Sequence, residues 1–442
     1  VFGKQPKATR SHDRILLHPP HFLPMKTIFA LALLTCLTSA FARELPVATL
    51  PAGARLAVIG DSITEQKIYT RFLEVYLLAC AGRSDIHCFQ FGWSGEQASG
   101  FNARLENDLS VFKPTAATTC YGMNDGHYVP YADAIGAEYE KNMRSILTKL
   151  QAMGVKTIVT GAPGAVDTTY FKGIPAAVYN DNLAHLRDID RKLATEFHTL
   201  FGNVHDEMTG AMTQAKAALG ADYDVCGRDG VHPGGNGHLL MAAAMLKALG
   251  CDGEIGTITL DMNGAAQASD GHRIVAGKSG EVSLESSRWP FCFDGDAKTG
   301  TRSILAFCDF NQSLNRLTLK VNNLSGAKAR VTWGTETKEF TKEQLAGGIN
   351  LAAEFQHTPF DAAFAKLMGA VYNKQAYETT MIKGMITNFR AFAADTETDP
   401  EFATALSTLK NKMASKQTAL DEAVHQLLVP VPHNLKVEPM AN

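Results

Sequence analysis

Apolar positions in the first half of the 442-residue chain recur with two alternating spacings. Stretches with apolar residues at helical spacing predict helices over residues 64–79, 132–153, 178–197 and 237–249. Short, continuous apolar runs between them predict buried strands, over residues 55–59, 86–91, 116–121, 155–160 and 201–204. Strands separated by helices of this length pair in parallel, with helices on both faces of the sheet. The pattern therefore predicts a three-layer α/β domain.

The pattern changes near residue 252. Residues 255–350 are rich in Thr, Asn and Gly and alternate with period two, as in Leu317–Val321, which predicts half-buried antiparallel strands. Helical spacing returns from residue 359 to about 428, with a helix limit at Asp399-Pro400. We predict four segments: a leader and signal peptide at 1–42, the α/β domain at 43–252, a β-rich accessory module at 253–350 and a helical C-terminal region at 351–442.

The N-terminal segment has the form of an export signal. Met25-Lys26 is followed by an apolar run and then by Ala40-x-Ala42, which predicts cleavage after Ala42. The run is too short to span a membrane, and a lipoprotein signal through Cys36 is the alternative. Residues 1–24 are interpreted as the product of a start codon placed too early, or as a long leading segment. We expect a secreted or periplasmic protein without a membrane span.

Composition and charge exclude several classes of protein. The chain is 45% hydrophobic, with 42 basic and 45 acidic residues, which argues against general disorder and against a nucleic-acid partner. Loss of residues 1–42 would leave a formal charge of −7, which suits a soluble exported protein. No Cys-x-x-Cys or His-x-x-x-His spacing occurs, so no metal site is expected.

Export would permit disulfide bonds. Of the eight cysteines, Cys36 would leave with the signal, so that at least one of the other seven is unpaired or bonded to another chain. Cys292 and Cys308 bracket one loop-rich stretch and form the expected pair, while Cys80, Cys88 and Cys120 are also consistent with buried thiols.

A serine stands at the junction between the first predicted strand and the first predicted helix, in the motif Gly60-Asp-Ser-Ile-Thr64. Ligand sites of open α/β folds gather at the carboxyl edge of the sheet, and a helix N-terminus favours negative charge. Both features suit Ser62 as a nucleophile whose reaction creates an oxyanion. Taken alone, however, Asp or Ser before a helix is most often only an N-cap.

The motif Asp229-Gly-Val-His-Pro233 supplies the partners that a serine nucleophile requires. A serine hydroxyl reacts well only when a general base removes its proton, and a carboxylate orients that base. His232 lies three positions after Asp229, so that one loop can bring the carboxylate to the imidazole. The alternative is an ordinary polar loop that caps the following helix.

Two further motifs, Phe91-Gly-Trp-Ser-Gly95 and Tyr121-Gly-Met-Asn-Asp125, follow the second and third predicted strands. Gly92 follows the second strand and Asn124 the third, and a glycine N–H or an Asn side-chain N–H can bind a substrate oxygen closely. With the Ser62 N–H, they would form an oxyanion hole with three donors. Each motif alone is a common turn, but all four occur in order at strand ends.

The four motifs match in order the signature blocks of the SGNH hydrolases, also called GDSL esterases, through Ser62, Gly92, Asn124 and His232. Ile63 stands in place of the leucine of the family name, and the blocks around Asn124 and His232 match without departure. The resemblance covers residues 54–250. It implies a flavodoxin-like three-layer fold and ester hydrolysis through an acyl-serine intermediate, with no metal or organic cofactor.

The substrate is harder to predict. Trp93, His127 and Tyr128 flank the motifs and are candidates for substrate contact, the alternatives being core packing for Trp93 and a solvated loop for the other two. An exported SGNH hydrolase with a β-rich module resembles the polysaccharide O-acetyl esterases, which implies an acylated glycan as substrate. A lysophospholipase or broad short-acyl esterase, and a non-catalytic glycan-binding protein, are the alternatives. The oligomeric state stays open.

Overall fold

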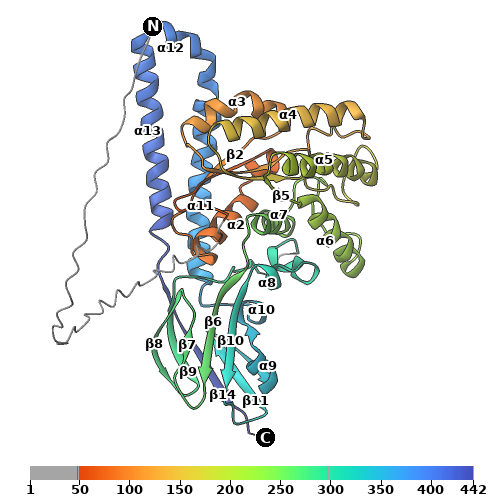
Figure 1. Cartoon of the computed structure of the whole chain (residues 1–442). Coiled ribbons are helices and arrows are strands. Elements are labelled where there is room, and N and C mark those ends of the chain that lie inside the picture. The colour runs from red at the N-terminus through yellow and green to blue at the C-terminus, as the bar shows by residue number, and fades with distance from the viewer. Residues whose placement is uncertain (1–46, 48, 296–297, 442) are drawn as a thin grey trace, which may run out of the picture. The chain divides into compact units, whose positions relative to one another are not determined.

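The first half of the chain forms a parallel sheet of five strands in the order β2-β1-β3-β4-β5 (Figure 1). The computed structural model describes residues 47, 49–295 and 298–441, and the predicted signal peptide and leader lie outside them. This strand order is that of flavodoxin-like folds, so the predicted fold class is confirmed. The strands are β1 (Arg55–Gly60), β2 (His87–Gly92), β3 (Ala116–Cys120), β4 (Thr157–Gly161) and β5 (Leu200–Gly202).

Helices cover both faces of this sheet. Along β1, Ala57 and Ile59 pack on the face covered by α3 (Ala98–Ser110) and α4 (Asp133–Ala152), while Leu56 and Val58 belong to the core on the other face. The alternation follows from the two-residue period of a strand. The other long helices of this half are α2 (Tyr69–Val75), α5 (Ala176–Glu196), α6 (Val204–Leu219) and α7 (Gly235–Ala248). Sequence analysis did not predict α3 and α6.

The first predicted helix is interrupted. Instead of one helix over 64–79, the chain forms α1 (Ser62–Glu65), α2 and the π-helical turn η1 (Tyr76–Cys80). Lys67 lies between α1 and α2 with a φ of 59°, which no α-helix accommodates. The break confines α1 to a single turn that begins at Ser62.

Two smaller sheets follow. The first has the order β13-β10-β6-β7 and the second the order β12-β11-β14-β9-β8. Their strands are β6 (Glu254–Asp261), β7 (Gln267–Ala268), β8 (His272–Lys278), β9 (Glu281–Ser286), β10 (Arg316–Asn322), β11 (Lys328–Trp333), β12 (Glu336–Thr341), β13 (Ile349–Asn350) and β14 (Val431–Pro439). The expectation of purely antiparallel pairing is wrong for β10, which pairs with β6 in parallel and with β13 antiparallel. Short helices connect these strands, namely η2 (Thr301–Phe307), α8 (Phe310–Ser313), α9 (Lys342–Gly347) and α10 (Leu351–Glu354).

The strand β14 lies inside the region that we predicted to be helical, so that prediction holds only as far as His425. Its residues alternate between buried and exposed, and it pairs with both β11 and β9. The strand β14 therefore lies at the centre of the second sheet, between β11 and β9.

A helical insert, residues 361–425, leaves the β module before β14 and lies along the α/β domain (Figure 1). Its helix α11 covers the free edge of β2, where Lys374 Nζ donates to the Cys88 carbonyl at 2.5 Å and Gln90 N–H donates to Glu378 at 3.0 Å. An uncovered edge strand presents unpaired backbone groups that can pair with another chain, and α11 occupies such groups on β2. The insert comprises α11 (Asp361–Met381), η3 (Ile382–Ile386), η4 (Asn388–Phe392), α12 (Ala393–Thr398) and α13 (Pro400–His425).

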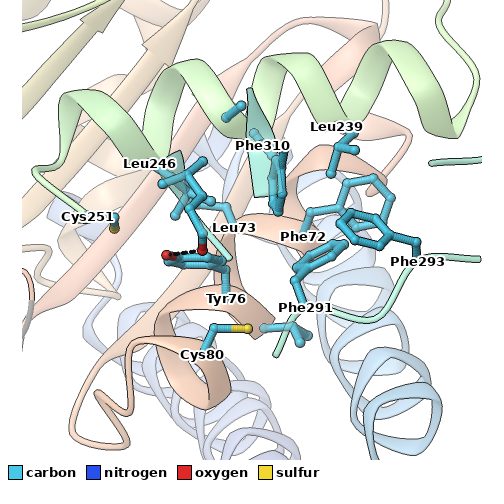
Figure 2. Packing of buried hydrophobic residues seen from close by; sticks show 14 of the residues in the cluster. Phe72, Leu73, Tyr76, Cys80, Leu239, Leu246, Cys251, Phe291, Phe293 and Phe310 are labelled. Atoms are coloured by element: carbon cyan, nitrogen blue, oxygen red, sulfur yellow. Dashed lines mark hydrogen bonds between the residues drawn. The ribbon is translucent and has the colours of Figure 1, made fainter. Parts of the chain in front are cut away.

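The β module shares a hydrophobic core with the α/β domain. Figure 2 shows Phe291, Phe293 and Phe310 of the module packed against side chains of α2 and α7. The Phe291 ring meets the Phe72 ring edge-on with centroids 5.7 Å apart, and Tyr76 OH donates to the Leu314 carbonyl at 2.8 Å. The module is thus anchored to the domain that carries Ser62.

The expected disulfide is wrong, because all seven cysteines in the described part of the chain are free. Cys292 Sγ lies 3.5 Å from Thr358 Oγ1, while Cys308 follows η2, where burial raises the pKa of its thiol to about 11. The two cysteine side chains therefore lie in different surroundings. Within the described ranges no helix is both long and apolar enough to cross a membrane.

We predict that Leu435→Ala lowers the free energy of unfolding by about 2–5 kcal/mol, because Leu435 is fully buried on the central strand β14. Lys436→Ala, at the exposed neighbouring position, should change it by less than about 0.5 kcal/mol. Urea unfolding of the full chain measures both. Equal, small losses would show that β14 does not contribute to the fold as its pairing indicates.

Candidate active site

Ser62 lies where β1 meets the first turn of helix. Asp61 is the N-cap of α1, and its carboxylate accepts a hydrogen bond from Ile63 N–H at 3.0 Å. The Ser62 N–H has no acceptor among the described residues. An unengaged N–H at a helix N-terminus is a ready donor for an anion.

Three predicted residues meet in a hydrogen-bonded chain. His232 Nε2 lies 2.9 Å from Ser62 Oγ, and His232 Nδ1 lies 2.7 Å from Asp229 Oδ2. Because a carboxylate only accepts, the imidazole donates from Nδ1, and Nε2 is then the acceptor for the serine hydroxyl. The structure thus brings these three side chains together at the end of β1 that carries Ser62.

Asp229 is held as a carboxylate. Its partial burial alone would raise its pKa, but the backbone amides of His232 and Val231 and the imidazole donate to it, and the net pKa lies below the ordinary value. Both amide bonds measure 2.9 Å. The charge that orients His232 is therefore kept at neutral pH.

The loop that carries Asp229 and His232, between α6 and α7, requires glycine at two positions. Gly227 and Gly230 have φ of 82° and 81°. A Cβ at Gly227 would lie 1.9 Å from the His232 carbonyl oxygen, and one at Gly230 would lie 2.3 Å from Phe171 N. The tight loop thus depends on the absence of side chains there.

Asn124, which follows β3, presents an oriented amide. Its Nδ2 donates to the Glu96 carbonyl at 3.0 Å, and its Oδ1 accepts from Tyr128 OH at 3.0 Å. These two bonds define the orientation of the amide and leave one Nδ2 N–H available. Tyr128, a predicted substrate contact, is thus shown to position Asn124.

Gly92 is a correction. It ends the edge strand β2, and Trp93 N–H, one residue later, donates to Gly60 O at 3.0 Å. N–H groups of alternate residues point to the same side of a strand, so Gly92 N–H points the same way as that of Gln90, which faces Glu378 of α11. The Gly92 N–H therefore faces away from β1 and Ser62, and the prediction of this oxyanion donor is wrong.

Gly95, the second glycine of the same motif, is a better candidate for the backbone N–H that donates to the oxyanion. Gly95 has a φ of 73°, and a Cβ there would meet nothing within 4 Å. Its N–H has no acceptor in the described part of the chain. The neighbouring Glu96 carbonyl accepts from Asn124, which brings this loop beside the Asn124 amide. The motif contains both glycines, and only the strand pairing distinguishes them.

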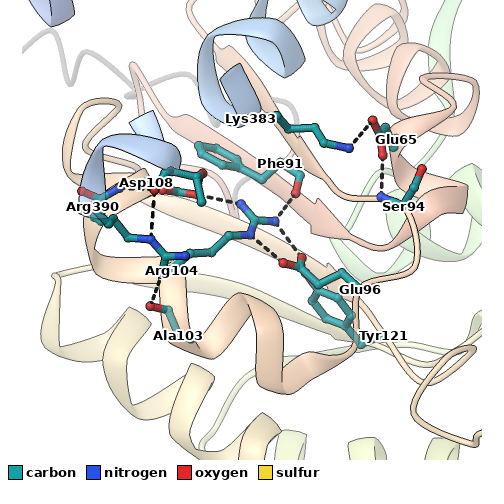
Figure 3. Close-up of polar contacts among 12 residues, drawn as sticks. Glu65, Phe91, Ser94, Glu96, Ala103, Arg104, Asp108, Tyr121, Lys383 and Arg390 are labelled. Atoms are coloured by element: carbon teal, nitrogen blue, oxygen red, sulfur yellow. Dashed lines mark hydrogen bonds and ion pairs between the residues drawn. The ribbon is translucent and has the colours of Figure 1, made fainter. Parts of the chain in front are cut away.

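A buried guanidinium fixes this loop (Figure 3). Arg104 of α3 donates to both Glu96 carboxylate oxygens at 2.7 Å, to the Phe91 carbonyl at 2.9 Å and to Asp108 at 2.8 Å. On the other side of the loop, Ser94 N–H donates to Glu65, which pairs with Lys383 of the insert at 2.8 Å. Sequence reasoning missed Lys383 because its partner Glu65 is 318 positions away. It missed Arg104 although Glu96 and Asp108 are only 8 and 4 positions away, because no motif marks this residue.

The two remaining predicted contacts have defined surroundings. Trp93 is half-buried, with Arg104 and Lys383 over its ring at 4.9 and 4.7 Å. It lines a polar hollow of about 420 Å³ with Glu96, Gln97 and other residues of the loop and α3. His127 is exposed, has a φ of 56°, and accepts from Gln97 at 3.2 Å.

Asp61 generates a prediction on pH and stability. Its burial raises its pKa from 3.8 to about 7, so the folded protein keeps this proton to a higher pH than the unfolded chain does. The wild type therefore loses stability as pH rises from about 4 to 7. Asn caps a helix equally well and cannot ionise, so the free energy of unfolding of Asp61→Asn does not carry this loss. Relative to the wild type, it should rise by up to about 1.4 kcal/mol for each pH unit by which the pH increases between about 4 and 7.

Urea unfolding of both proteins between about pH 5 and pH 7 checks this expectation. Asp133→Asn, at an exposed position in the first turn of α4, is the matched control for the exchange of Asp for Asn at the start of a helix. A constant difference for Asp61→Asn would contradict the assignment of a raised pKa.

Comparison with known proteins agrees with this geometry. Residues 58–240 match the model of the GDSL-like Lipase/Acylhydrolase family. No curated protein matches the chain. A gut microbial diltiazem-metabolizing enzyme has a similar solved structure, with a TM-score of 0.69 and 21% identity, covering 88% of this chain and 99% of that one.

Two other solved structures resemble only part of the chain. One is an α/β hydrolase enzyme from the metagenome of Lake Arreo in Spain, with a TM-score of 0.38 and 23% identity over 46% of this chain and 98% of that one. The other is an acetylxylan esterase from Geobacillus stearothermophilus, with a TM-score of 0.38 and 22% identity over 46% of this chain and 96% of that one. Residues 58–240 form a domain of the GDSL-like lipase/acylhydrolase family, and the chain is a serine ester hydrolase.

Proposed function

We propose that the chain is an exported esterase that removes acetyl groups from a carbohydrate through an acyl-serine intermediate on Ser62. The observation that carries the proposal is the chain of hydrogen bonds from Asp229 through His232 to the Ser62 hydroxyl, at 2.7 and 2.9 Å. Export rests on the signal motif that ends at Ala42.

In the first half of the reaction, His232 Nε2 accepts the Ser62 proton while Ser62 Oγ attacks the ester carbonyl. The oxyanion receives hydrogen bonds from the N–H groups of Ser62 and Gly95 and from Asn124 Nδ2. One such donor is worth about 10²–10³ in rate. His232 then gives its proton to the departing alcohol, and the acyl group stays on Ser62.

In the second half, a water molecule takes the place of the alcohol. His232 accepts a proton from the water, whose oxygen attacks the acyl carbonyl, and the proton then returns to Ser62 as the acid leaves. Asp229 stays ionised and orients the ring in both halves. Because only the neutral imidazole accepts a proton, the rate should fall at acidic pH.

The polar hollow supports a carbohydrate as the alcohol part of the substrate. It adjoins the Gly95 loop and combines one aromatic ring, Trp93, with carboxylate, amide and guanidinium groups of Glu96, Gln97 and Arg390. These groups already have partners within the protein, such as Arg104 for Glu96 and the Ala103 carbonyl for Arg390, but each can form a further hydrogen bond with a sugar hydroxyl, which an acyl chain does not offer. His232 and Asp229 also keep 33% and 56% of their side-chain surface exposed, which leaves room for a bulky alcohol.

A second cavity favours the alternative of a lysophospholipase or broad short-acyl esterase. It measures about 680 Å³ and is lined by aromatic side chains of α2, the β module and α11, namely Phe72, Phe291, Phe293 and Phe364. Charged side chains, among them Arg71, Asp294 and Arg302, also line the cavity, and its aromatic part could contact a longer acyl chain. The third hypothesis, a non-catalytic glycan-binding protein, is disfavoured by the intact Ser62–His232–Asp229 geometry.

The decisive experiment compares substrates with wild type and Ser62→Ala. We expect acetate release from at least one of acetylated xylan, pectin and peptidoglycan, and a rate at least about 10³-fold lower for Ser62→Ala. Ser110→Ala, at an exposed position on α3, should retain the wild-type rate. Faster fatty-acid release from lysophosphatidylcholine would favour the alternative, and equally slow turnover of an activated acetyl ester by wild type and Ser62→Ala would favour the binding protein.

A second prediction concerns the insert. Lys383 Nζ lies 2.8 Å from Glu65, whose other oxygen accepts from Ser94 N–H, so Lys383 is expected to hold the Gly95 donor in place. We predict that Lys383→Met lowers kcat roughly 10-fold with little change in KM, because the donor acts on the transition state. Lys412→Met, at an exposed position on α13, is the control. A wild-type kcat for a folded Lys383→Met protein would show that the insert does not position the loop.

A further inference from the structure

Three side chains that could bind a metal meet where the helical insert contacts the sheet. His87 is the first residue of β2, and Asp421 and His425 lie one turn apart on α13. One nitrogen or oxygen of each lies within 4.8 Å of the other two. The cluster joins residues more than 330 positions apart, which is why no local spacing in the sequence predicted it.

His425 has the arrangement of a metal ligand. Its Nδ1 lies 2.9 Å from the Ser84 carbonyl oxygen, and because a carbonyl only accepts, Nδ1 carries the proton. The neutral ring then presents a lone pair at Nε2, as in histidines that bind a metal through one nitrogen and donate from the other. This Nε2 is buried and has no hydrogen-bond partner in the described ranges.

The unpartnered nitrogen faces a carboxylate. Asp421 Oδ2 lies 3.8 Å from His425 Nε2 and 2.5 Å from His87 Nδ1. A lone pair beside a carboxylate oxygen is unfavourable, and either a proton on Nε2 or a metal cation between the two atoms relieves the repulsion. Ligand atoms of a tetrahedral zinc site are about 3.3 Å apart, so shifts below about 1 Å would bring these atoms into position.

The neighbouring charges are compatible with a cation. Lys374 Nζ contacts Asp421 at 3.3 Å, but through Oδ1, whereas Oδ2 accepts from His87 Nδ1. Lys374 also pairs with Glu74 at 2.8 Å and Glu378 at 3.4 Å, so its charge is shared among three acidic groups. Solvent reaches the cluster through His87, whose side chain is 37% exposed.

We propose that His87, Asp421 and His425 bind a divalent transition-metal ion, with Zn²⁺ as the best match to two imidazoles and one carboxylate. Nδ1 of His87, Oδ2 of Asp421 and Nε2 of His425 are the ligands, and water completes the coordination. His87 Nδ1 donates to Asp421 Oδ2 in the metal-free chain, so binding of the ion releases this proton to solvent. The ion ties α13 to the edge strand β2 and so stabilises the docked insert. The site is separate from the Ser62 triad, so the proposed esterase function does not depend on it.

The test uses the full chain, freed of metal with a chelator and then titrated with Zn²⁺ alone. Calorimetry should show one tight site per chain, and His87→Ala and His425→Ala should each weaken it at least about 100-fold. Zn²⁺ should raise the melting temperature of the wild type but not of these variants. The matched control is His185→Ala, because His185 has the same spacing from Asp181 on α5, at 3.8 Å, but belongs to no three-ligand cluster in the described chain.

Two outcomes would overturn the proposal. One is equal Zn²⁺ binding and equal thermal shifts for the wild type, His425→Ala and His185→Ala. The other needs no variant: wild-type protein loaded with Co²⁺ that lacks the visible absorption of a tetrahedral site with nitrogen ligands. The second measurement keeps the test valid if His87→Ala or His425→Ala fails to fold.

Discussion

The arrangement of the active site depends on the buried guanidinium of Arg104. A charge in the protein interior is tolerated only when its donors are paired, and Arg104 is only 2% exposed. Its partners are the carboxylate of Glu96, the carbonyl at the end of β2 and Asp108, which in turn accepts from Thr387 of the insert at 2.7 Å. The same Glu96 accepts from Asn124 through its backbone carbonyl. One ionic group thus couples the sheet edge, the Gly95 loop, the Asn124 amide and the helical insert, so the catalytic loop and the insert form one structural unit.

This coupling explains how the C-terminal half is attached. The chain leaves the β module, covers the exposed edge of β2 with α11, and returns to place β14 in the centre of the second sheet. An edge strand needs such a cover, and a central strand supplies two sets of ladder bonds. The C-terminal half is therefore held by hydrogen bonds to two sheets, from α11 to β2 and from β14 to β11 and β9. The position of the insert against the active-site loop follows from these two attachments and from the ion pair between Lys383 and Glu65.

The residues of the candidate site differ in how far the sequence alone could predict them. Ser62 and Asn124 lie in short motifs at strand ends, which parallel strands bring to one edge. The Asp229–His232 pair was also expected at a strand end but lies on the loop between α6 and α7, where the spacing of three residues brings the carboxylate to the imidazole. The choice between Gly92 and Gly95 depends on the direction of an N–H group, which strand pairing determines and residue identity does not. The strand β14 shows a clear alternation, yet it lies next to a helix, where we extended the helical pattern too far. The contacts of Lys383 and of His425 join distant segments, and no local pattern encodes them.

The C-terminal half contributes to the lining of two cavities, the hollow at the Gly95 loop and the aromatic cavity at α2. Thr387 and Arg390 of the insert help to line the polar hollow, and Asp361 and Phe364 of the same insert help to line the aromatic cavity. The β module adds Phe291 and Phe293 to the second but nothing to the first. The groups that perform the chemistry therefore come from the α/β domain, while the C-terminal half shapes the spaces around them. Because the family motifs reside only in the α/β domain, they identify the reaction, and the substrate has to be read from the insert and the β module.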